Sequence, residues 1–387
     1  MDFSFTEEQE LLRREAQRFC EKELNREYVR WMDENCDFIP DQLWKKMTEL
    51  GHFGATIPQE YGGLGLGMVD AMIIMEELST ASVSVALGIG ATVGFGAKMI
   101  SALGTKEQKK KYLPKLAKGE IKFALGLTEP GGGTDILGAI QTKAEDKGDH
   151  WLINGRKMFI TAAHVADYII TIAITDSKAK RSKGLSIFLV PRPNQGLETR
   201  LIKKLGCHSC GTNEVYYDDV RVPKENLLGT LNNGWYELLL TLNPERIATA
   251  MMSLGIAKAA FRDAMEYVKQ REAFGGPIAR FQILQHYLAD ITIEIECARN
   301  LIYKCAWLAD VGKPMHIEAC MAKIVAGRAS EKAAILGMEI LGGYGYTMEY
   351  DMQRYFRDYK QMVFSPITDE MAKNVIMQFM GLPKSWA

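Results

Sequence analysis

The feature that most constrains the fold of this chain is the spacing of its apolar residues, which changes twice along the sequence. Segments 6–119 and 234–387 carry apolar residues at the 3.6-residue spacing of amphipathic helices. Between them, segment 121–232 holds short apolar and β-branched runs separated by turn residues. This order predicts an α+β protein with an N-terminal helical domain, a β domain and a C-terminal helical domain. We place the domain boundaries at 1–120, 121–232 and 233–387.

The β region and the second helical region allow finer expectations. The turn residues between the β runs are typical of an antiparallel barrel or sandwich, and the long amphipathic stretches after them predict a helix bundle. Strands are expected at 151–155, 168–175, 185–190 and 214–223, and long helices at 245–270, 281–309 and 317–341.

Charge and cysteine content exclude several classes of protein. The 47 Lys and Arg residues balance 48 Asp and Glu residues, so no charge excess indicates nucleic acid or an anionic membrane as a partner. Residues 1–8 carry charge where a secretion signal needs an apolar core, and the seven scattered cysteines favour reduced thiols. We therefore expect a cytoplasmic protein that does not bind nucleic acid.

One segment has about the length that crosses a bilayer. Residues 78–97 carry no charged side chain. They are rich in Gly, Ala, Ser and Thr and contain few large apolar residues. This composition predicts a buried, tightly packed helix and no membrane span.

Four segments combine residue types that suit ligand contact. Residues 127–135 join three consecutive glycines to two threonines, so N–H and hydroxyl groups can approach a phosphate or the edge of a heteroaromatic ring. In 157–161 an aromatic residue precedes a Thr hydroxyl, Arg271 can form a bidentate contact with a phosphate, and 339–346 exposes backbone. Taken singly, each segment also fits a structural role as a turn, a strand or a helix end.

Taken together, the order of these segments is similar to that of the acyl-CoA dehydrogenase family. The resemblance spans nearly the whole chain. The matching segments are 58–63 (PQEYGG), 127–135 (LTEPGGGTD), 154–161 (NGRKMFIT), 204–206 (KLG), 219–223 (DVRVP), Arg271 with Phe274-Gly275, and 341–346 (LGGYGY).

The resemblance implies a helical domain, a β-barrel-like domain and a C-terminal four-helix bundle, with FAD between the last two in a homotetramer. Phe159 to Thr161 would pack against the flavin ring, and Phe159 stands where Trp is common in the family. The implied FAD contacts are Leu125, Leu127, Thr128, Gly133, Thr134, Phe159, Ile160, Thr161, Arg271, Phe274, Gln282, Glu339, Gly342, Gly343 and Thr368, of which those from Arg271 to Gly343 would contact the FAD of a neighbouring subunit.

The usual catalytic base of the family has no counterpart in this chain. The common pattern places a Glu shortly after an Arg-Asp-Ala-Lys-like motif. Here that motif is 357–360 (RDYK), and the position that matches the base is Pro366. Proline cannot remove a proton, and it lacks the backbone N–H that helps to hold the thioester oxygen in the family. The replacement that the resemblance suggests is Glu245, because one branch of the family carries its base on this helix, just before an Arg.

Two compatible roles are open for Glu245. As a base, it would have a raised pKa, because burial beside an acyl chain disfavours its charge. As a structural residue, it would lie in the first turn of a helix and interact favourably with the helix dipole. Asn243, Arg246 and Thr134 would contact the substrate, with Arg246 near the thioester or the CoA end. Glu370 is a weaker candidate for the base.

The resemblance predicts an enzyme that oxidises an acyl-CoA to the 2,3-enoyl-CoA. A carboxylate would remove the α proton, flavin N5 would accept the β hydride, and electrons would pass to an electron-transferring flavoprotein. Within enzymes, the alternatives are the reverse reaction of an enoyl-CoA reductase and the oxidation of an alicyclic or aryl-substituted acyl-CoA by a relocated base. A scaffold subunit that binds FAD and a thioester without turnover is the alternative of another class.

Cys207 and Cys210 form a Cys-x-x-Cys pair, which can be redox active or supply half of a zinc site. No second pair or His cluster has the spacing of a zinc site. The pair overlaps the family's Lys-Leu-Gly loop, so we interpret it as structural and expect no metal.

Overall fold

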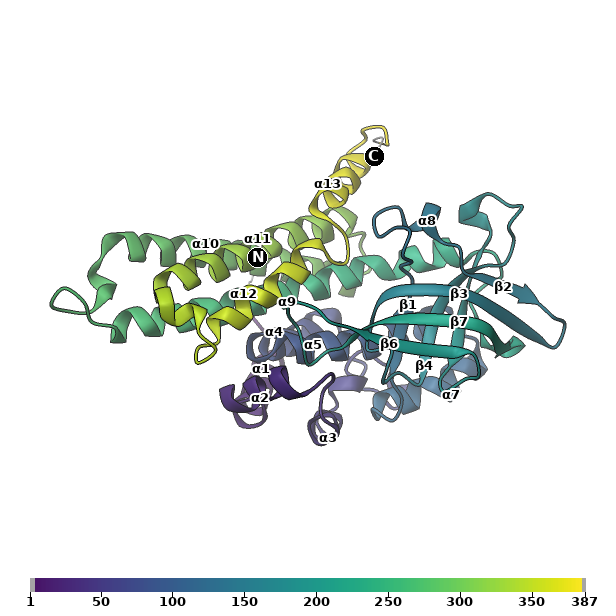
Figure 1. Ribbon diagram of the computed structural model, residues 1–387, viewed down its shortest axis with the longest axis horizontal. Coiled ribbons are helices and arrows are strands. Elements are labelled where there is room, and N and C mark those ends of the chain that lie inside the picture. Colours follow the sequence, from purple (N-terminus) through teal and green to yellow (C-terminus); the bar gives the residue numbers. More distant parts are fainter. Residues whose placement is uncertain (1–3, 385–387) are drawn as a thin grey trace.

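The computed structural model describes residues 4–384 of the chain. Figure 1 shows short helices from the N-terminal part, a sheet from the middle part, and long helices from the C-terminal part that extend away from the sheet. The expected succession of helices, strands and helices is confirmed.

The N-terminal region is helical, and its first helix begins where the sequence indicates. The Thr6 side chain accepts a hydrogen bond from the Gln9 N–H (3.2 Å), and the Gln9 side chain accepts one from the Thr6 N–H (3.2 Å). This capping box satisfies two of the N–H groups that a helix start leaves unpaired. The helices are α1 (Glu7–Glu23), α2 (Arg26–Asn35), α3 (Asp41–Glu49), α4 (Met68–Ala81), α5 (Val83–Ile89), the π-helical η3 (Gly90–Phe95), α6 (Gly96–Leu103) and α7 (Lys106–Ala117).

The uncharged segment 78–97 covers the end of α4 and most of the continuous helical run α5–η3–α6. By length and composition the window Val83–Leu103 could cross a membrane, but 67% of it is buried inside the protein. Its small residues allow this close packing, so the expectation of a buried helix is confirmed.

The middle region forms an open sheet of eight strands in the order β6-β7-β3-β2-β4-β5-β8, with β1 paired to β4. The expected antiparallel barrel is wrong, because the edge strands β6 and β8 do not pair with each other, and β4 runs parallel to both β1 and β2. The strands are β1 (Phe123–Gly126), β2 (Lys143–Asp146), β3 (His150–Thr161), β4 (Tyr168–Ile174), β5 (Leu185–Pro191), β6 (Leu197–Ile202), β7 (Thr212–Pro223) and β8 (Leu227–Leu228), with the short helix α8 (Ile136–Ala139) between β1 and β2.

The C-terminal region is a helical domain in which α9, α10, α11 and α12 pack against one another. Its first helix is longer than the sequence indicates, because α9 begins at Gly234 and continues through Pro244. The helices are α9 (Gly234–Gln270), α10 (Gln282–Asp310), α11 (His316–Leu341), α12 (Met352–Phe364) and α13 (Asp369–Phe379).

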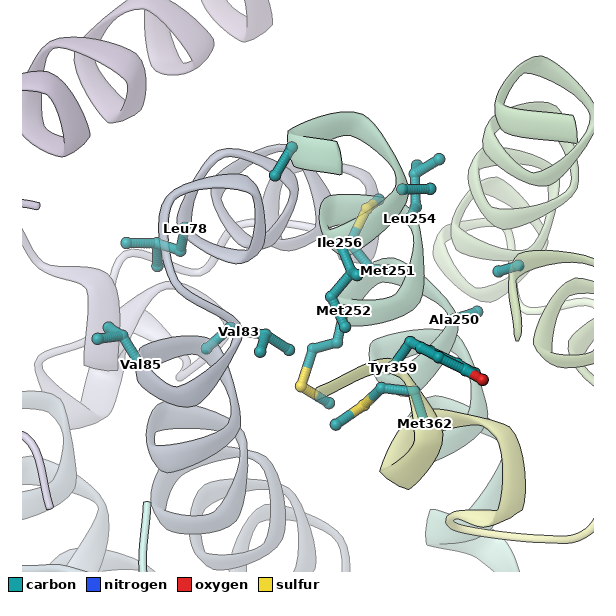
Figure 2. Close-up of a cluster of buried hydrophobic side chains, with 14 of the residues drawn as sticks. Leu78, Val83, Val85, Ala250, Met251, Met252, Leu254, Ile256, Tyr359 and Met362 are labelled. Atoms are coloured by element: carbon teal, nitrogen blue, oxygen red, sulfur yellow. The ribbon is translucent and has the colours of Figure 1, made fainter. Parts of the chain in front are cut away.

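The long helix α9 contributes to two apolar cores. Leu238, near its start, belongs to the core under the β sheet. Further along, α9 joins the core that the N-terminal helices share with the bundle, and Figure 2 shows Val83 facing Met252 of α9 and Met362 of α12. Burial of these side chains at about 25 cal/mol per Å² fixes α9 between the β domain and the helices.

Candidate active site

The glycine-rich segment after β1 is held in place by a buried ion pair that the sequence did not reveal. Lys157 of β3 is fully buried and donates to Glu129 Oε1 (2.7 Å) and to the carbonyl of Leu127 (3.2 Å). Glu129 also accepts from the N–H groups of Gln141 and Thr142, at 2.7 and 3.1 Å. The carboxylate therefore joins both ends of the glycine-rich segment to the sheet.

The electrostatics of this pair keep Glu129 ionised. Burial raises the pKa of the Glu129 carboxyl, but the Lys157 ammonium and the hydrogen bonds lower it by more, so the pKa lies below its usual range. Burial lowers the pKa of Lys157, and the Glu129 charge opposes that change. Because both charges are buried, removing one partner of this pair is strongly destabilising.

Next to this ion pair, β3 bulges and turns Phe159 outward. The register of β3 against β7 shifts between Lys157 and Ile160, and Phe159 has a φ of 60°. At the bulge the Met158 N–H donates a hydrogen bond to the Thr128 carbonyl (2.8 Å), so β3 and the glycine-rich segment are adjacent. Phe159 is 61% exposed. A left-handed aromatic residue that presents its ring to solvent is a strained conformation of the kind found at ligand sites.

The structure distributes the expected FAD contacts of the β domain over this surface. Thr134 and Gly133 are exposed, and a Cβ at Gly133 would have no neighbour within 4 Å, so a ligand can approach the backbone closely. Ile160 and Leu127 point into the core, so only their backbone can reach a cofactor. Leu125, Thr128 and Thr161 are partly buried.

Except for Thr368, the N-cap of α13, the remaining expected FAD contacts lie at the other end of the bundle. Arg271 follows the C-terminal end of α9, which has 37 residues and is therefore about 55 Å long. The other end of α9 lies next to β5, where the Asn232 N–H donates a hydrogen bond to Ser186 Oγ (2.8 Å). Arg271, Gly342 and Gly343 line one cavity of about 510 Å³. Phe274 beside it is 89% exposed with a φ of 52°. Gln282 and Glu339 are exposed as well.

Glu245 lies in the interior of α9, and the expected position in a first turn is therefore wrong. The helix dipole acts within the first turn, so it does not explain the residue. Pro244 cannot donate the helical hydrogen bond to the Leu240 carbonyl, which loosens the helix one residue before Glu245. Glu245 is partly buried and makes no hydrogen bond or ion pair within residues 4–384. Burial raises its pKa to about 7, and Arg246 offsets only part of that rise.

Arg246 and Asn243 form a polar group beside Glu245. Arg246 is 8% exposed and donates through Nη1 to Asn243 Oδ1 (2.7 Å). No carboxylate of the described chain pairs with this guanidinium. The Asn243 amide in turn contacts His316 Nδ1 of α11 (2.7 Å). A nearly buried guanidinium without an anionic partner can donate to an anionic or carbonyl oxygen of a ligand.

The segment that carries the usual base position borders the same helices. Pro366 precedes α13, whose N-cap is Thr368. Lys323 of α11 donates to the Val363 carbonyl and to Asp369 Oδ1, the latter at 2.7 Å. The first turns of α11 therefore contact Asn243 on one side and the 363–369 segment on the other. Glu370 is exposed at the start of α13.

The raised pKa of Glu245 predicts a pH-dependent stability difference. The folded protein holds this proton up to about pH 7, whereas the unfolded chain loses it near the ordinary value of 4.5. Stability from this group is present at low pH and is lost as the pH rises through about 7. We expect Glu245→Gln to raise the melting temperature relative to wild type at about pH 8, and to raise it less or not at all at about pH 5. Calorimetry of both proteins checks this, and an equal shift at both pH values would contradict it.

The Cys207–Cys210 loop has a structural environment. Both thiols are fully buried and free, and burial raises their pKa values. The Cys207 N–H donates to Asp358 Oδ1 of α12 (2.6 Å), and Lys204 donates to the Cys207 carbonyl. The loop thus fixes the β domain to the bundle. Within residues 4–384 no group of three or more His, Cys, Asp or Glu side chains is arranged to hold a metal ion.

Two functional features could not be identified from the sequence. The Lys157–Glu129 pair joins residues far apart in the sequence, although both lie inside the quoted motifs. His316 belongs to no motif. The signal that could have indicated the pair is an acidic and a basic residue in otherwise apolar, ligand-like segments, since buried charges require partners.

Comparisons with known proteins point to one family over nearly the whole chain. Family models described as the N-terminal, middle and C-terminal domains of acyl-CoA dehydrogenase match residues 6–120, 124–220 and 232–381. A glutaryl-CoA dehydrogenase of Desulfococcus multivorans is 40% identical over 92% of each chain. A subunit of the caffeyl-CoA reductase-Etf complex of Acetobacterium woodii is 37% identical over 96% of this chain and 98% of the relative.

Solved structures show the same fold. Butyryl-CoA dehydrogenase from Megasphaera elsdenii superposes with a TM-score of 0.93 at 36% identity, over 98% of this chain and 100% of the other. A Bacillus anthracis acyl-CoA dehydrogenase complexed with FAD gives 0.90 at 31% identity, over 97% of this chain and 67% of the other.

Proposed function

Because this chain belongs to the acyl-CoA dehydrogenase family, we propose that it interconverts an acyl-CoA and the corresponding 2,3-enoyl-CoA, with Glu245 as the base. The family consists of flavoprotein oxidoreductases that act on CH–CH bonds, and the cofactor is FAD. The observation that carries the proposal is Glu245 itself: a partly buried carboxyl with no partner in the described chain, inside a helix, beside a guanidinium without a carboxylate.

The residues present fit this cofactor. Two separate surfaces each combine an exposed aromatic residue of positive φ, Phe159 or Phe274, with glycines that leave open space. We propose that the surface near Phe159 holds the flavin ring, through the 125–134 backbone, Phe159 and Thr161. The cavity at Arg271 and Gly342 would hold the more distant part of the FAD of a neighbouring subunit. The length of α9 separates this cavity from the surface near Phe159, and this separation is consistent with a homotetramer.

The chemistry assigned to the chain is proton transfer at the α carbon. The Glu245 carboxylate removes the α proton and becomes neutral, the β carbon gives up a hydride with its electron pair, and a C=C bond remains. Bound FAD supplies the acceptor for that hydride. A pKa of about 7 gives Glu245 more basic strength than an exposed carboxylate while a large fraction stays ionised near neutral pH. Arg246 would bind near the thioester or the CoA end, and Asn243, Thr134 and Thr368 would line the site.

The direction of the reaction and the electron partner are part of the proposal. The glutaryl-CoA dehydrogenase relative supports oxidation, whereas the caffeyl-CoA reductase relative supports reduction of an aryl-substituted enoyl-CoA. Both directions would use the same carboxyl group and the same cofactor, with Glu245 as the base in oxidation and as the acid in reduction. The relative from the reductase-Etf complex favours an electron-transferring flavoprotein as the partner.

Anaerobic reduction of the flavin tests this function. We expect the purified FAD-bound protein to lose its yellow colour when mixed with one or more of a panel of linear, branched, alicyclic and aryl-substituted acyl-CoAs. In the reverse test, protein reduced chemically should be reoxidised by the matching enoyl-CoA. The loss of absorbance, followed by stopped flow, gives the preferred substrate.

Two results would overturn the proposal. Protein that binds acyl-CoAs but stays oxidised with all of them, and is not reoxidised by the enoyl-CoAs, would be a binding scaffold. Protein that cannot be loaded with FAD would contradict the assignment of the cofactor contacts.

A further inference from the structure

We infer that His316 is a positioning residue, which orients the Asn243 amide and through it the Arg246 guanidinium beside Glu245. The inference rests on the proposed function, because it assigns His316 to the same site. His316 lies at the start of α11, outside all the segments that match the family pattern. It touches neither Glu245 nor Arg246 directly in any hydrogen bond of the described chain.

The direction of each hydrogen bond follows from the donor at one end. A guanidinium only donates, so Arg246 Nη1 requires the amide oxygen of Asn243 to face it, at 2.7 Å. The amide nitrogen must then face α11, where it lies 2.7 Å from His316 Nδ1. An amide nitrogen only donates, so Nδ1 accepts and the ring proton resides on Nε2. Neutral His316 therefore selects one of the two orientations of the Asn243 amide.

The imidazole is itself held by the C-terminal helix. The Phe379 ring of α13 stacks on His316 with centroids 4.4 Å apart and planes inclined by 6°. At the other end of α13, Asp369 is fixed by Lys323. Between these points Ala372 packs against Cys320 and Ile324 of α11. Helix α13 thus lies antiparallel along the first turns of α11 and supports the ring that orients Asn243.

Loss of the acceptor would affect ligand binding more than folding. Without His316 Nδ1, the Asn243 amide can rotate and turn its NH2 toward Arg246, where two donors oppose each other. The guanidinium would then leave its position beside Glu245. Since a single neutral hydrogen bond is lost, binding of a CoA thioester should weaken by up to about tenfold.

The test compares His316→Leu with His316→Gln in the FAD-bound enzyme. The dissociation constant of a non-reducing CoA thioester is measured by the change that it causes in the flavin spectrum, and kcat and KM are measured with a reducing acyl-CoA. We expect His316→Leu to raise both Kd and KM about five- to tenfold, with a smaller change in kcat. The Oε1 atom of Gln can accept from Asn243, so His316→Gln should restore most of the binding. The exposed His286 of α10 provides a matched control, and His286→Leu should bind like wild type.

Two further variants test the route through Asn243. In an Asn243→Ala background, adding His316→Leu should change Kd by less than twofold, because the amide that His316 orients is gone. Phe379→Leu removes only the stacked ring from a residue that is 55% exposed, so it should fold, and it should raise Kd about two- to threefold. This variant decides the question if His316→Leu does not accumulate.

Several outcomes would overturn the inference. They are an unchanged Kd in folded His316→Leu or in Phe379→Leu, a Gln variant no better than the Leu variant, or full additivity with Asn243→Ala. The binding measurement does not require turnover. Wild-type protein that never reduces its flavin therefore contradicts the proposed function, whereas an unaffected Kd contradicts only the role of His316.

Discussion

Replacing Glu245 with glutamine is expected to lower kcat by about 10²- to 10⁴-fold, the range that a positioned general base contributes. Glutamine has nearly the same shape but cannot accept the α proton. It also avoids ionising a buried group, so the protein should fold, bind FAD and bind a CoA thioester as well as wild type. Steady-state turnover with an artificial electron acceptor, together with flavin content, measures the effect.

Glu370→Gln is the matched control for this variant. Glu370 is exposed at the start of α13, near the usual base position of the family. We expect this variant to keep kcat within about twofold of wild type, since it removes a surface carboxylate. The opposite pattern, with Glu245→Gln active and Glu370→Gln inactive, would place the base on α13.

Lys157→Met should give the largest loss of stability among single substitutions at the site. The change leaves the Glu129 carboxylate buried without a counter-charge, and breaking such a pair costs about 3–5 kcal/mol. Because Glu129 joins the two ends of the glycine-rich segment, FAD affinity should fall as well. Urea unfolding at neutral pH and the flavin content after purification measure the two effects.

Two comparisons separate burial from simple loss of an ion pair. Lys147 and Glu145 have the same 2.7 Å separation but are exposed, so Lys147→Met should destabilise the protein far less than Lys157→Met. The double variant Glu129→Leu, Lys157→Met removes both buried charges and should recover much of the stability, but not FAD binding, since the segment stays untied. A single variant Lys157→Met as stable as Lys147→Met would contradict the account.

The order of elements could be predicted from the sequence because it depends on local periodicity. Apolar spacing identified the long helices and strands such as β4, which the structure places at Tyr168–Ile174. The start of α9 could not be predicted, because Pro244 normally marks a first turn, and packing of Leu238 under the sheet extends the helix before it. The open sheet was missed because β1 and β2 have four residues each, too few to carry a periodic pattern.

The candidate site shows the same division between local and long-range information. The glycines and aromatic residues of the proposed FAD surfaces could be identified from motifs, and Glu245 could be proposed as the base because Pro366 occupies the usual base position. Contacts between distant segments could not be identified, because no local pattern pairs Lys157 with Glu129 or His316 with Asn243. The bulge at Phe159 could not be predicted either, because the register shift depends on the pairing of β3 with β7.

Exchange of α hydrogens with solvent deuterium tests the role of Glu245 most directly. Phenylacetyl-CoA has hydrogens on its α carbon and none on the next carbon, so proton removal occurs without hydride transfer. Mass spectrometry of this thioester, incubated in D2O with the FAD-bound enzyme, should show deuterium uptake with wild type and with Glu370→Gln, and none above background with Glu245→Gln. Uptake by Glu245→Gln at the wild-type rate would contradict the assignment of the base.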